Sequence, residues 1–145
     1  MKRRATAIWQ GNGTEGKGSL TSVSGVLNNT PYSSTTRFKN EDGREGTNPE
    51  ELIAAAHSGC YAMALSYGLT GAGFVPTELK VEAAVNLEKI TDHFEITGVH
   101  LDVTGKVPGI TEEKFLELAK DAKVNCPVSR ALKALEITLS AKLVQ

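Results

Sequence analysis

The sequence has little net charge and only two cysteines. Its 16 basic and 17 acidic side chains give a formal net charge of −1 over 145 residues, so no overall field attracts nucleic acid. The first residues lack the apolar run of a secretory signal peptide, and we therefore expect a cytoplasmic protein. In that reducing compartment we expect no permanent disulfide, so the cysteines should be core residues, metal ligands or redox groups.

No segment of the sequence has the composition of a membrane span. The most apolar segment, Leu52–Thr77, lacks Asp, Glu, Lys and Arg, but its glycines, serines and His57 make it too polar for a bilayer. It predicts instead a buried helix, and the preceding residues Asn48–Glu51 form a typical helix start. Asn caps the free N–H groups, Pro fits the first helical position, and the two Glu complement the helix dipole. We expect this helix to end in the glycines that follow Tyr67.

The other segments predict strands and two further helices. Strands are expected at Arg4–Gln10, Ser19–Ser24, Tyr32–Phe38, Leu79–Leu87, Phe94–Val103 and Leu135–Val144. A change of phase around Thr97-Gly98 predicts a β-bulge, and Thr111 is expected to cap a second helix. The charged segment Lys39–Gly46 should be an exposed loop. These elements predict one α+β domain over residues 1–145, with antiparallel sheets around the long buried helix.

One glycine-rich segment, 11–18, resembles part of a phosphate-binding loop. Gly16-Lys17 fits the pattern, but Gly18 stands where a Ser or Thr would hold magnesium. The residues that follow alternate like a strand and would not provide the helix N-terminus that binds phosphate. We therefore expect a hairpin loop.

The two cysteines occupy different kinds of position. Cys60 lies in the middle of the apolar helix, whereas Cys126 stands before Pro127 at the expected start of a short helix. Each could be a small core residue. A helix N-terminus, however, stabilises a thiolate and lowers its pKa. A two-cysteine peroxidase needs one thiolate to attack the O–O bond and a second thiol to resolve the sulfenic acid, and this pair could serve if folding brings it together.

Cys60 lies too far inside its helix to gain much from the helix dipole. Its activation therefore requires an external cation. Arg37 is the best candidate, because it closes a Thr-rich segment shortly before the helix. Arg44 and Arg130 are weaker candidates for the same role.

The histidines leave two other chemistries open. His57 could act as a base in a Cys–His hydrolase, or it could join Cys60 and Cys126 in a zinc site with His93 or His100. Neither arrangement has distinctive ligand spacing. We expect His57 to be a packed or hydrogen-bonded histidine. A binding protein in which the cysteines are core residues is a third possibility.

Several motifs keep a characteristic order over most of the chain. They are Thr36-Arg37-Phe38, Gly46–Leu52, Ala55-Ala56-His57, Cys60, Met63-Ala64-Leu65, Val107–Ile110 and Cys126–Ser129. Together they resemble the OsmC/Ohr family of thiol peroxidases. Because the arginine stands shortly before the Asn-Pro-Glu motif, the sequence is most similar to the OsmC branch.

This resemblance implies a peroxidase without cofactor or metal that reduces organic hydroperoxides, and hydrogen peroxide more weakly, in oxidative and osmotic stress defence. It implies that Cys60 attacks, that Cys126 resolves through a Cys60–Cys126 disulfide, and that Arg37 and Glu50 form the polar part of the site. It further implies a dithiol reductant of the lipoyl type and an intertwined homodimer. No nucleic acid or membrane partner is expected.

Helix geometry adds one expectation about the dimer. Glu50 and Cys60 are ten residues apart on the expected helix, which corresponds to about 15 Å along its axis. The two side chains cannot share a site within one chain if the helix is continuous. We therefore expect Glu50 to serve the Cys60 of a partner chain, with the helices packed antiparallel through the small residues 54–59 and the active sites at the subunit interface.

Overall fold

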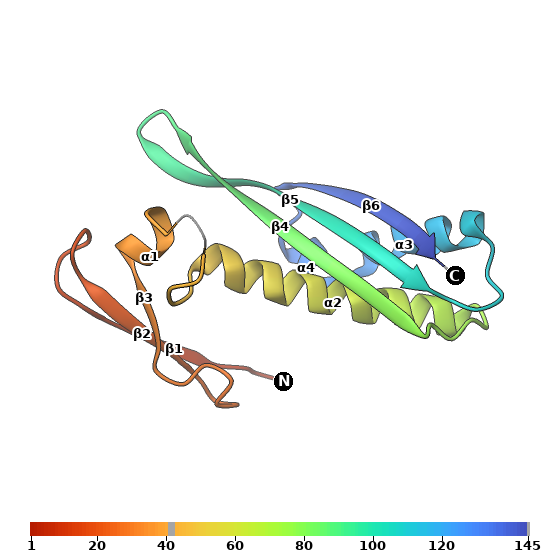
Figure 1. Ribbon diagram of the computed structural model, residues 1–145, viewed down its shortest axis with the longest axis horizontal. Helices are drawn as coiled ribbons and strands as arrows, with labels where there is room; N and C mark the ends of the chain where they lie inside the picture. The colour runs from red at the N-terminus through yellow and green to blue at the C-terminus, as the bar shows by residue number, and fades with distance from the viewer. Residues whose placement is uncertain (41–42, 145) are drawn as a thin grey trace. The chain divides into compact units, whose positions relative to one another are not determined.

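A computed structural model describes residues 1–40 and 43–144 of the chain, which form two compact units, Met1–Leu52 and Ile53–Gln145. The first unit contains a three-stranded antiparallel sheet of β1 (Ala5–Gln10), β2 (Lys17–Ser22) and β3 (Thr30–Ser33) (Figure 1). The single-domain organisation over residues 1–145 stays a prediction.

The glycine-rich segment between β1 and β2 is a hairpin loop, as the sequence predicted. The side chain of Asn12 accepts hydrogen bonds from the backbone N–H groups of Thr14 and Glu15, at 2.9 and 2.8 Å. These bonds close a local turn, as Asn side chains commonly do. The loop leads into strand β2 and not into a helix, so it lacks the helix N-terminus of a phosphate site.

The predicted strand Tyr32–Phe38 was wrong in its second half. The strand stops at Ser33, and α1 (Ser34–Phe38) begins there. Ser33 Oγ accepts a hydrogen bond from the Thr36 backbone N–H, and Thr36 Oγ1 accepts one from the Ser33 backbone N–H. This reciprocal capping box outweighs the strand preference of threonine. Arg37 therefore lies on a short helix and not at the end of a strand.

The long helix α2 (Pro49–Gly71) begins where the sequence predicted. Asn48 Oδ1 accepts a hydrogen bond of 2.8 Å from the Glu51 backbone N–H. The buried side chains of α2 recur every fourth residue and are His57, Tyr61, Leu65 and Leu69. On other sides Met63 and Tyr67 are 62% and 75% exposed. A single chain therefore covers one stripe of this apolar helix.

The second unit contains a sheet in the order β4-β5-β6. β4 (Glu78–Ile90) and β5 (His93–Lys106) pair antiparallel, whereas β6 (Glu136–Val144) pairs parallel with β5. Thr97 is the extra residue between Ile96 and Gly98, opposite Asn86 and Leu87, so the predicted bulge is confirmed. The α+β class is confirmed too, and only the β5–β6 pairing departs from an antiparallel arrangement.

Two helices, α3 (Glu112–Asn125) and α4 (Pro127–Ala131), connect β5 to β6. Thr111 caps α3 as predicted, since its side chain accepts a hydrogen bond from the Lys114 backbone N–H. In the core of this unit, buried side chains from α2, β5 and α3 form one hydrophobic cluster. The core residues are Tyr61, Leu65, Leu69, Val99, Leu101, Val103, Phe115, Leu118, Ala119 and Ala122.

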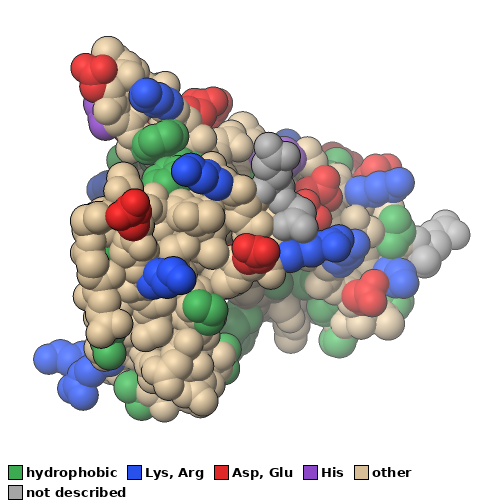
Figure 2. Space-filling view, turned by 60° about the vertical axis from the view of Figure 1, so that its left-hand side comes forward, with side chains coloured by type: hydrophobic (Ala, Val, Ile, Leu, Met, Phe, Trp, Pro, Cys, Tyr) green, Lys and Arg blue, Asp and Glu red, His purple; other side chains and the backbone are tan. Residues whose placement is uncertain are grey.

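Charged side chains of both signs lie on the surface. On the face that Figure 2 displays, acidic and basic side chains are interspersed, in agreement with the net charge of −1. Most described residues of the segment expected as a charged loop, 39–46, are exposed, while Glu41 and Asp42 lie outside the described residues. No helix among the described residues is long and apolar enough to cross a membrane.

A histidine lies in the core of the second unit. His57 is fully buried, and its Nε2 lies 2.7 Å from the hydroxyl oxygen of Ser129. Its Nδ1 is buried and has no hydrogen-bond partner among residues 1–40 and 43–144. Burial lowers the pKa of His57 from its ordinary value, because the protonated ring would lose its hydration. The predicted packed or hydrogen-bonded histidine is confirmed.

The first prediction concerns the fit between β5 and α3. A Cβ atom added at Gly105 would lie 2.5 Å from Cε2 of the buried Phe115 ring. We expect Gly105→Ala to lower the free energy of unfolding by about 1–3 kcal/mol, as overpacked cores do, measured by urea denaturation. Gly13→Ala is the control, since no atom lies within 4 Å of a Cβ there. Equal stability of G105A and the wild type would contradict the packing described.

The second prediction concerns acid stability. Because the pKa of His57 is lowered in the folded chain, the unfolded chain binds its proton at a higher pH than the folded chain does. The stability from the neutral imidazole is present above about pH 6.5 and is lost as the pH falls below that value, with a slope of at most about 1.4 kcal/mol per pH unit. We expect His57→Gln to flatten this slope in urea titrations at one protein concentration. Tyr61→Phe, which keeps the imidazole, should retain the slope, and an unchanged slope in H57Q would refute the assignment.

Candidate active site

The structure brings the two cysteines together within the second unit. Cys60 is partly buried on α2, and Cys126 is fully buried between α3 and α4. The backbone N–H of Cys126 donates to the Ala122 carbonyl at 2.8 Å and ends α3. Cys126 is also the N-cap residue of α4, and Pro127 follows it in the first turn. The thiol of Cys126 lies near enough to that of Cys60 to raise its pKa, although 66 positions separate the two residues in the sequence.

The surroundings of Cys60 act on its ionisation in opposite directions. Burial is the largest influence and raises the pKa of the Cys60 thiol, and the contact with Cys126 raises it further. A hydrogen bond from the Val128 backbone acts against both and lowers the pKa, because an N–H donor stabilises a thiolate. The start of α4 therefore supplies a donor to Cys60. The sequence analysis missed Val128, and the helix start at Cys126-Pro127 was the signal that could have indicated such a donor.

The structure joins the other two predicted site residues within the first unit. Arg37 donates from Nη2 to Glu50 Oε1 at 2.6 Å and from Nε to Glu50 Oε2 at 3.2 Å. The side chains are 33% and 12% exposed, so the pair is partly shielded from water. A two-bond arrangement of this kind fixes the plane of the guanidinium. The guanidinium carbon also lies 5.0 Å from the centre of the Phe38 ring.

A small pocket of about 130 Å³ lies beside Arg37 in the same unit. Its walls include the aromatic side chains of Trp9, Tyr32 and Phe38, and the rings of Trp9 and Tyr32 are 5.4 Å apart. This pocket therefore offers apolar surface next to a positive charge. The sequence analysis did not identify these aromatic residues, because they come from three separate elements.

The geometry does not by itself assign roles to the four predicted residues. Cys60 and Cys126 belong to one unit, and Arg37 and Glu50 belong to the other. α2 is one helix from Pro49 to Gly71, as the argument from helical rise assumed. The catalytic roles of Cys60, Cys126, Arg37 and Glu50 stay predictions.

The histidines all bind groups other than the cysteines. His57 pairs with Ser129, His93 with Glu95, and His100 with Thr138 and Ser140. Over residues 1–40 and 43–144, no group of three or more His, Cys, Asp and Glu side chains is arranged to hold a metal ion.

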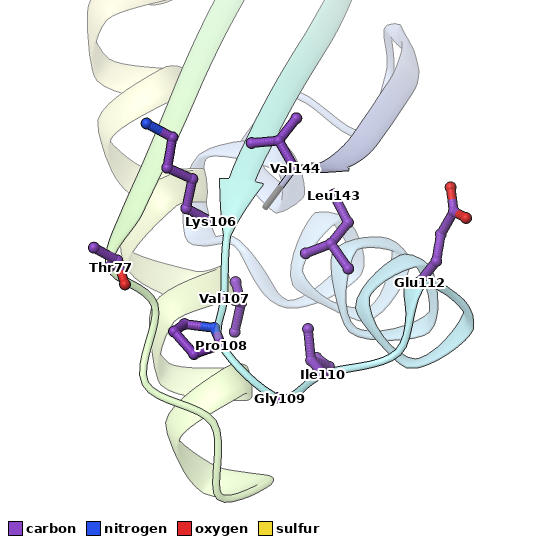
Figure 3. Close-up of a pocket in the computed structure, with 9 residues that line it drawn as sticks. All are labelled: Thr77, Lys106, Val107, Pro108, Gly109, Ile110, Glu112, Leu143 and Val144. Atoms are coloured by element: carbon purple, nitrogen blue, oxygen red, sulfur yellow. The ribbon is translucent and has the colours of Figure 1, made fainter.

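A larger pocket of about 670 Å³ in the second unit contains none of the predicted site residues. Figure 3 shows its lining at the end of β5, in the turn before α3 and at the end of β6. The turn is the Val107–Ile110 motif, in which Gly109 adopts φ +77°. This backbone conformation favours glycine. The motif is therefore accounted for by the turn that leads into α3.

Comparison with known proteins shows the family of this chain. The model of the OsmC-like protein family matches residues 40–140. The chain is 47% identical over 143 residues to Peroxiredoxin OsmC of Escherichia coli, which covers 99% of this chain and 97% of that protein. It is 29% identical over 127 residues to the organic hydroperoxide resistance protein OhrB of Bacillus subtilis, covering 86% of this chain and 89% of that protein.

The fold shows the same relationship. The crystal structure of OhrB from Bacillus subtilis superposes with a TM-score of 0.71 at 28% identity, covering 97% of this chain and 98% of that one. An OsmC-like protein from Vibrio cholerae, at 15% identity, shares the fold with a TM-score of 0.75 over 97% of this chain and 99% of that chain. The resemblance found in the sequence motifs is thus confirmed, and this chain belongs to the OsmC-like family, within the wider group of OsmC and Ohr proteins.

Proposed function

We propose that this protein is a thiol-dependent peroxidase that reduces organic hydroperoxides to alcohols. The observation that carries the proposal is the contact between Cys60 and Cys126, in a chain 47% identical to Peroxiredoxin OsmC. Two adjacent thiols, one partly buried and one fully buried, have the electrons and the arrangement for a two-step peroxide reduction.

In the first step the Cys60 thiolate attacks the terminal oxygen of the hydroperoxide. The O–O bond breaks, the sulfur becomes a sulfenic acid, and the alkoxide takes up a proton to leave as the alcohol. In the second step the Cys126 thiol attacks the Cys60 sulfur, so that a disulfide forms and water leaves. A dithiol of the lipoyl type then reduces the disulfide by exchange. The thiols supply both electrons, so the reaction needs no metal or cofactor.

The first step requires a positive group near Cys60. Only the thiolate attacks, and burial raises the pKa of the Cys60 thiol. The Val128 N–H offsets part of this cost, and Arg37 is suited to offset the rest. Glu50 holds the guanidinium through two hydrogen bonds, so that it can stabilise the thiolate and then the departing alkoxide.

The proposed site is completed in a homodimer. Because α2 is continuous, Glu50 lies about ten helical residues from the Cys60 of its own chain and serves the Cys60 of the partner. Met63 and Tyr67 leave apolar surface of α2 exposed in one chain. A Cβ added at Gly59 would meet no atom within 4 Å, so a second α2 can approach closely. Antiparallel packing of two α2 helices through residues 54–59 accounts for these features.

The pocket beside Arg37 suits the organic part of the substrate. Trp9, Tyr32 and Phe38 provide aromatic surface there, which favours an alkyl or aryl hydroperoxide over hydrogen peroxide. We assign this enzyme to oxidative and osmotic stress defence in the cytoplasm, a reducing compartment where a dithiol can regenerate the thiols.

The third prediction tests the chemistry. One equivalent of cumene hydroperoxide should remove two free thiols per wild-type chain, measured by thiol titration. Cys60→Ala should abolish this loss, because no attacking sulfur is left. Cys126→Ala should consume one equivalent and stop as a sulfenic acid, seen as one added oxygen by mass spectrometry. An unchanged thiol content with every hydroperoxide tried would favour a binding protein instead.

The fourth prediction tests whether Arg37 acts on the partner chain. Arg37→Met and Cys60→Ala should each be inactive, but co-expressed chains should regain up to about one quarter of wild-type activity. Random pairing makes half of the dimers mixed, and each mixed dimer then has one intact site.

The double variant R37M/C60A, co-expressed with wild type, provides the mirror control. Action on the partner chain makes these mixed dimers inactive, whereas action within one chain leaves each of them one working site. Absence of recovery in the first mixture, together with active mixed dimers in the second, would place Arg37 in its own chain's site.

A further inference from the structure

We propose that the buried hydrogen bond between His57 and Ser129 is a positioning device that holds α4 against α2, so that Cys126 stays within reach of Cys60. This inference deepens the proposed function, since it concerns the step in which the second thiol resolves the first. It gives roles to two residues outside the four predicted site residues.

The spacing of the residues supports this role. His57 precedes Cys60 by three positions on α2, and Ser129 follows Cys126 by three positions at the start of α4. Residues three apart on a helix share a face. The structure pairs His57 with Ser129 at 2.7 Å, and it pairs the two thiols with each other. The His57–Ser129 hydrogen bond and the neighbouring pair of thiols therefore lie between the same two elements, one helical turn apart.

α4 depends on such an anchor because it is short. It has five residues, and Cys126 makes no side-chain capping bond. A helix of this length is not stable by itself. Val128 and Leu132 pack against the core, but apolar contacts allow sliding and rotation. A hydrogen bond is directional, so the His57–Ser129 bond fixes how α4 is turned toward Cys60.

His57 is suited to hold one partner firmly. Both side chains of the bond are buried, so breaking it leaves polar atoms without water. Within the described part of the chain, Nδ1 of His57 has no hydrogen-bond partner, so the ring is anchored through Nε2. Burial also lowers the pKa of His57, which keeps the ring neutral. The bond therefore orients α4 without placing a second charge beside Cys60.

The test uses the equilibrium between the Cys60–Cys126 dithiol and its disulfide in a glutathione buffer. In this reaction one oxidised glutathione takes two electrons from the two thiols and leaves as two reduced glutathiones. The readout needs no peroxidase activity, so a failure of the proposed function would not affect it. The wild type should form the disulfide readily, because the thiols are already in contact.

Ser129→Ala removes the hydroxyl and should lower the dithiol–disulfide equilibrium constant about tenfold or more, which is about 30 mV for a two-electron couple. With cumene hydroperoxide, the same variant should form sulfenic acid within about threefold of the wild-type rate. Its disulfide should form about ten- to a hundredfold more slowly, as misplaced reacting groups do.

Two further comparisons separate positioning from general loosening. Tyr61→Phe is the matched control, since it also removes a buried hydrogen bond from α2, in this case a 2.9 Å bond to the Ala119 carbonyl on α3. Ser129→Thr and Ser129→Val have similar volume and differ in the hydroxyl, so they serve if S129A does not fold. We expect Tyr61→Phe and Ser129→Thr to keep the wild-type dithiol–disulfide equilibrium constant. Ser129→Val should lower that constant as Ser129→Ala does.

Two outcomes would overturn the inference. One is a wild-type dithiol–disulfide equilibrium in both S129A and Ser129→Val. The other is an equal loss in Tyr61→Phe, which would show that any loosening of α2 has the same effect.

Discussion

The proposed chemistry depends on bringing Cys60 and Cys126 together in the second unit, although 66 positions separate them in the sequence. The chain achieves this by returning from β5 through α3 and turning sharply at Cys126. That residue ends one helix and starts the next, with its backbone N–H bonded to Ala122 and its carbonyl accepting from Arg130. The position of the second thiol is thus set by backbone hydrogen bonds, and its partner lies on the longest helix.

The same contact creates an electrostatic problem. A buried thiol resists ionisation, and each unit of pKa shift corresponds to about 1.4 kcal/mol. Burial raises the pKa of Cys60, whereas the proposed chemistry requires its thiolate. In the proposed mechanism the Val128 N–H stabilises the thiolate as a local dipole, and the Arg37–Glu50 pair supplies a full positive charge. The negative charge of Glu50 partly offsets the positive charge of Arg37. In return, the two hydrogen bonds from Arg37 to Glu50 keep the guanidinium oriented.

Local signals in the sequence predicted the parts of the fold that local physics decides. The starts of α2 and α3 followed from Asn48 and Thr111, and the bulge at Thr97 followed from a change of phase. The segment Tyr32–Phe38 failed because a capping box at Ser33 competes with strand propensity. The parallel pairing of β6 could not be predicted, since alternation has the same period in either direction.

The candidate site likewise contains residues that the sequence could predict and contacts that it could not. The sequence could name Cys60, Cys126, Arg37 and Glu50 through motifs, and helical rise could separate Glu50 from Cys60. It could not find the Val128 donor or the Ser129 partner of His57, because these contacts arise only when α4 packs against α2. The position of His57 one turn before Cys60 left open a role as a base. Spacing on a helix shows which residues lie on the same side of it, but it does not show which group of another element binds them.

The buried pairing with Ser129 argues against that base. A base must accept the thiol proton, and burial disfavours the imidazolium that would result. A neutral histidine avoids this cost. In the proposed mechanism, charge therefore comes from Arg37 and alignment comes from His57, and the two requirements of a reactive thiol are met by separate groups.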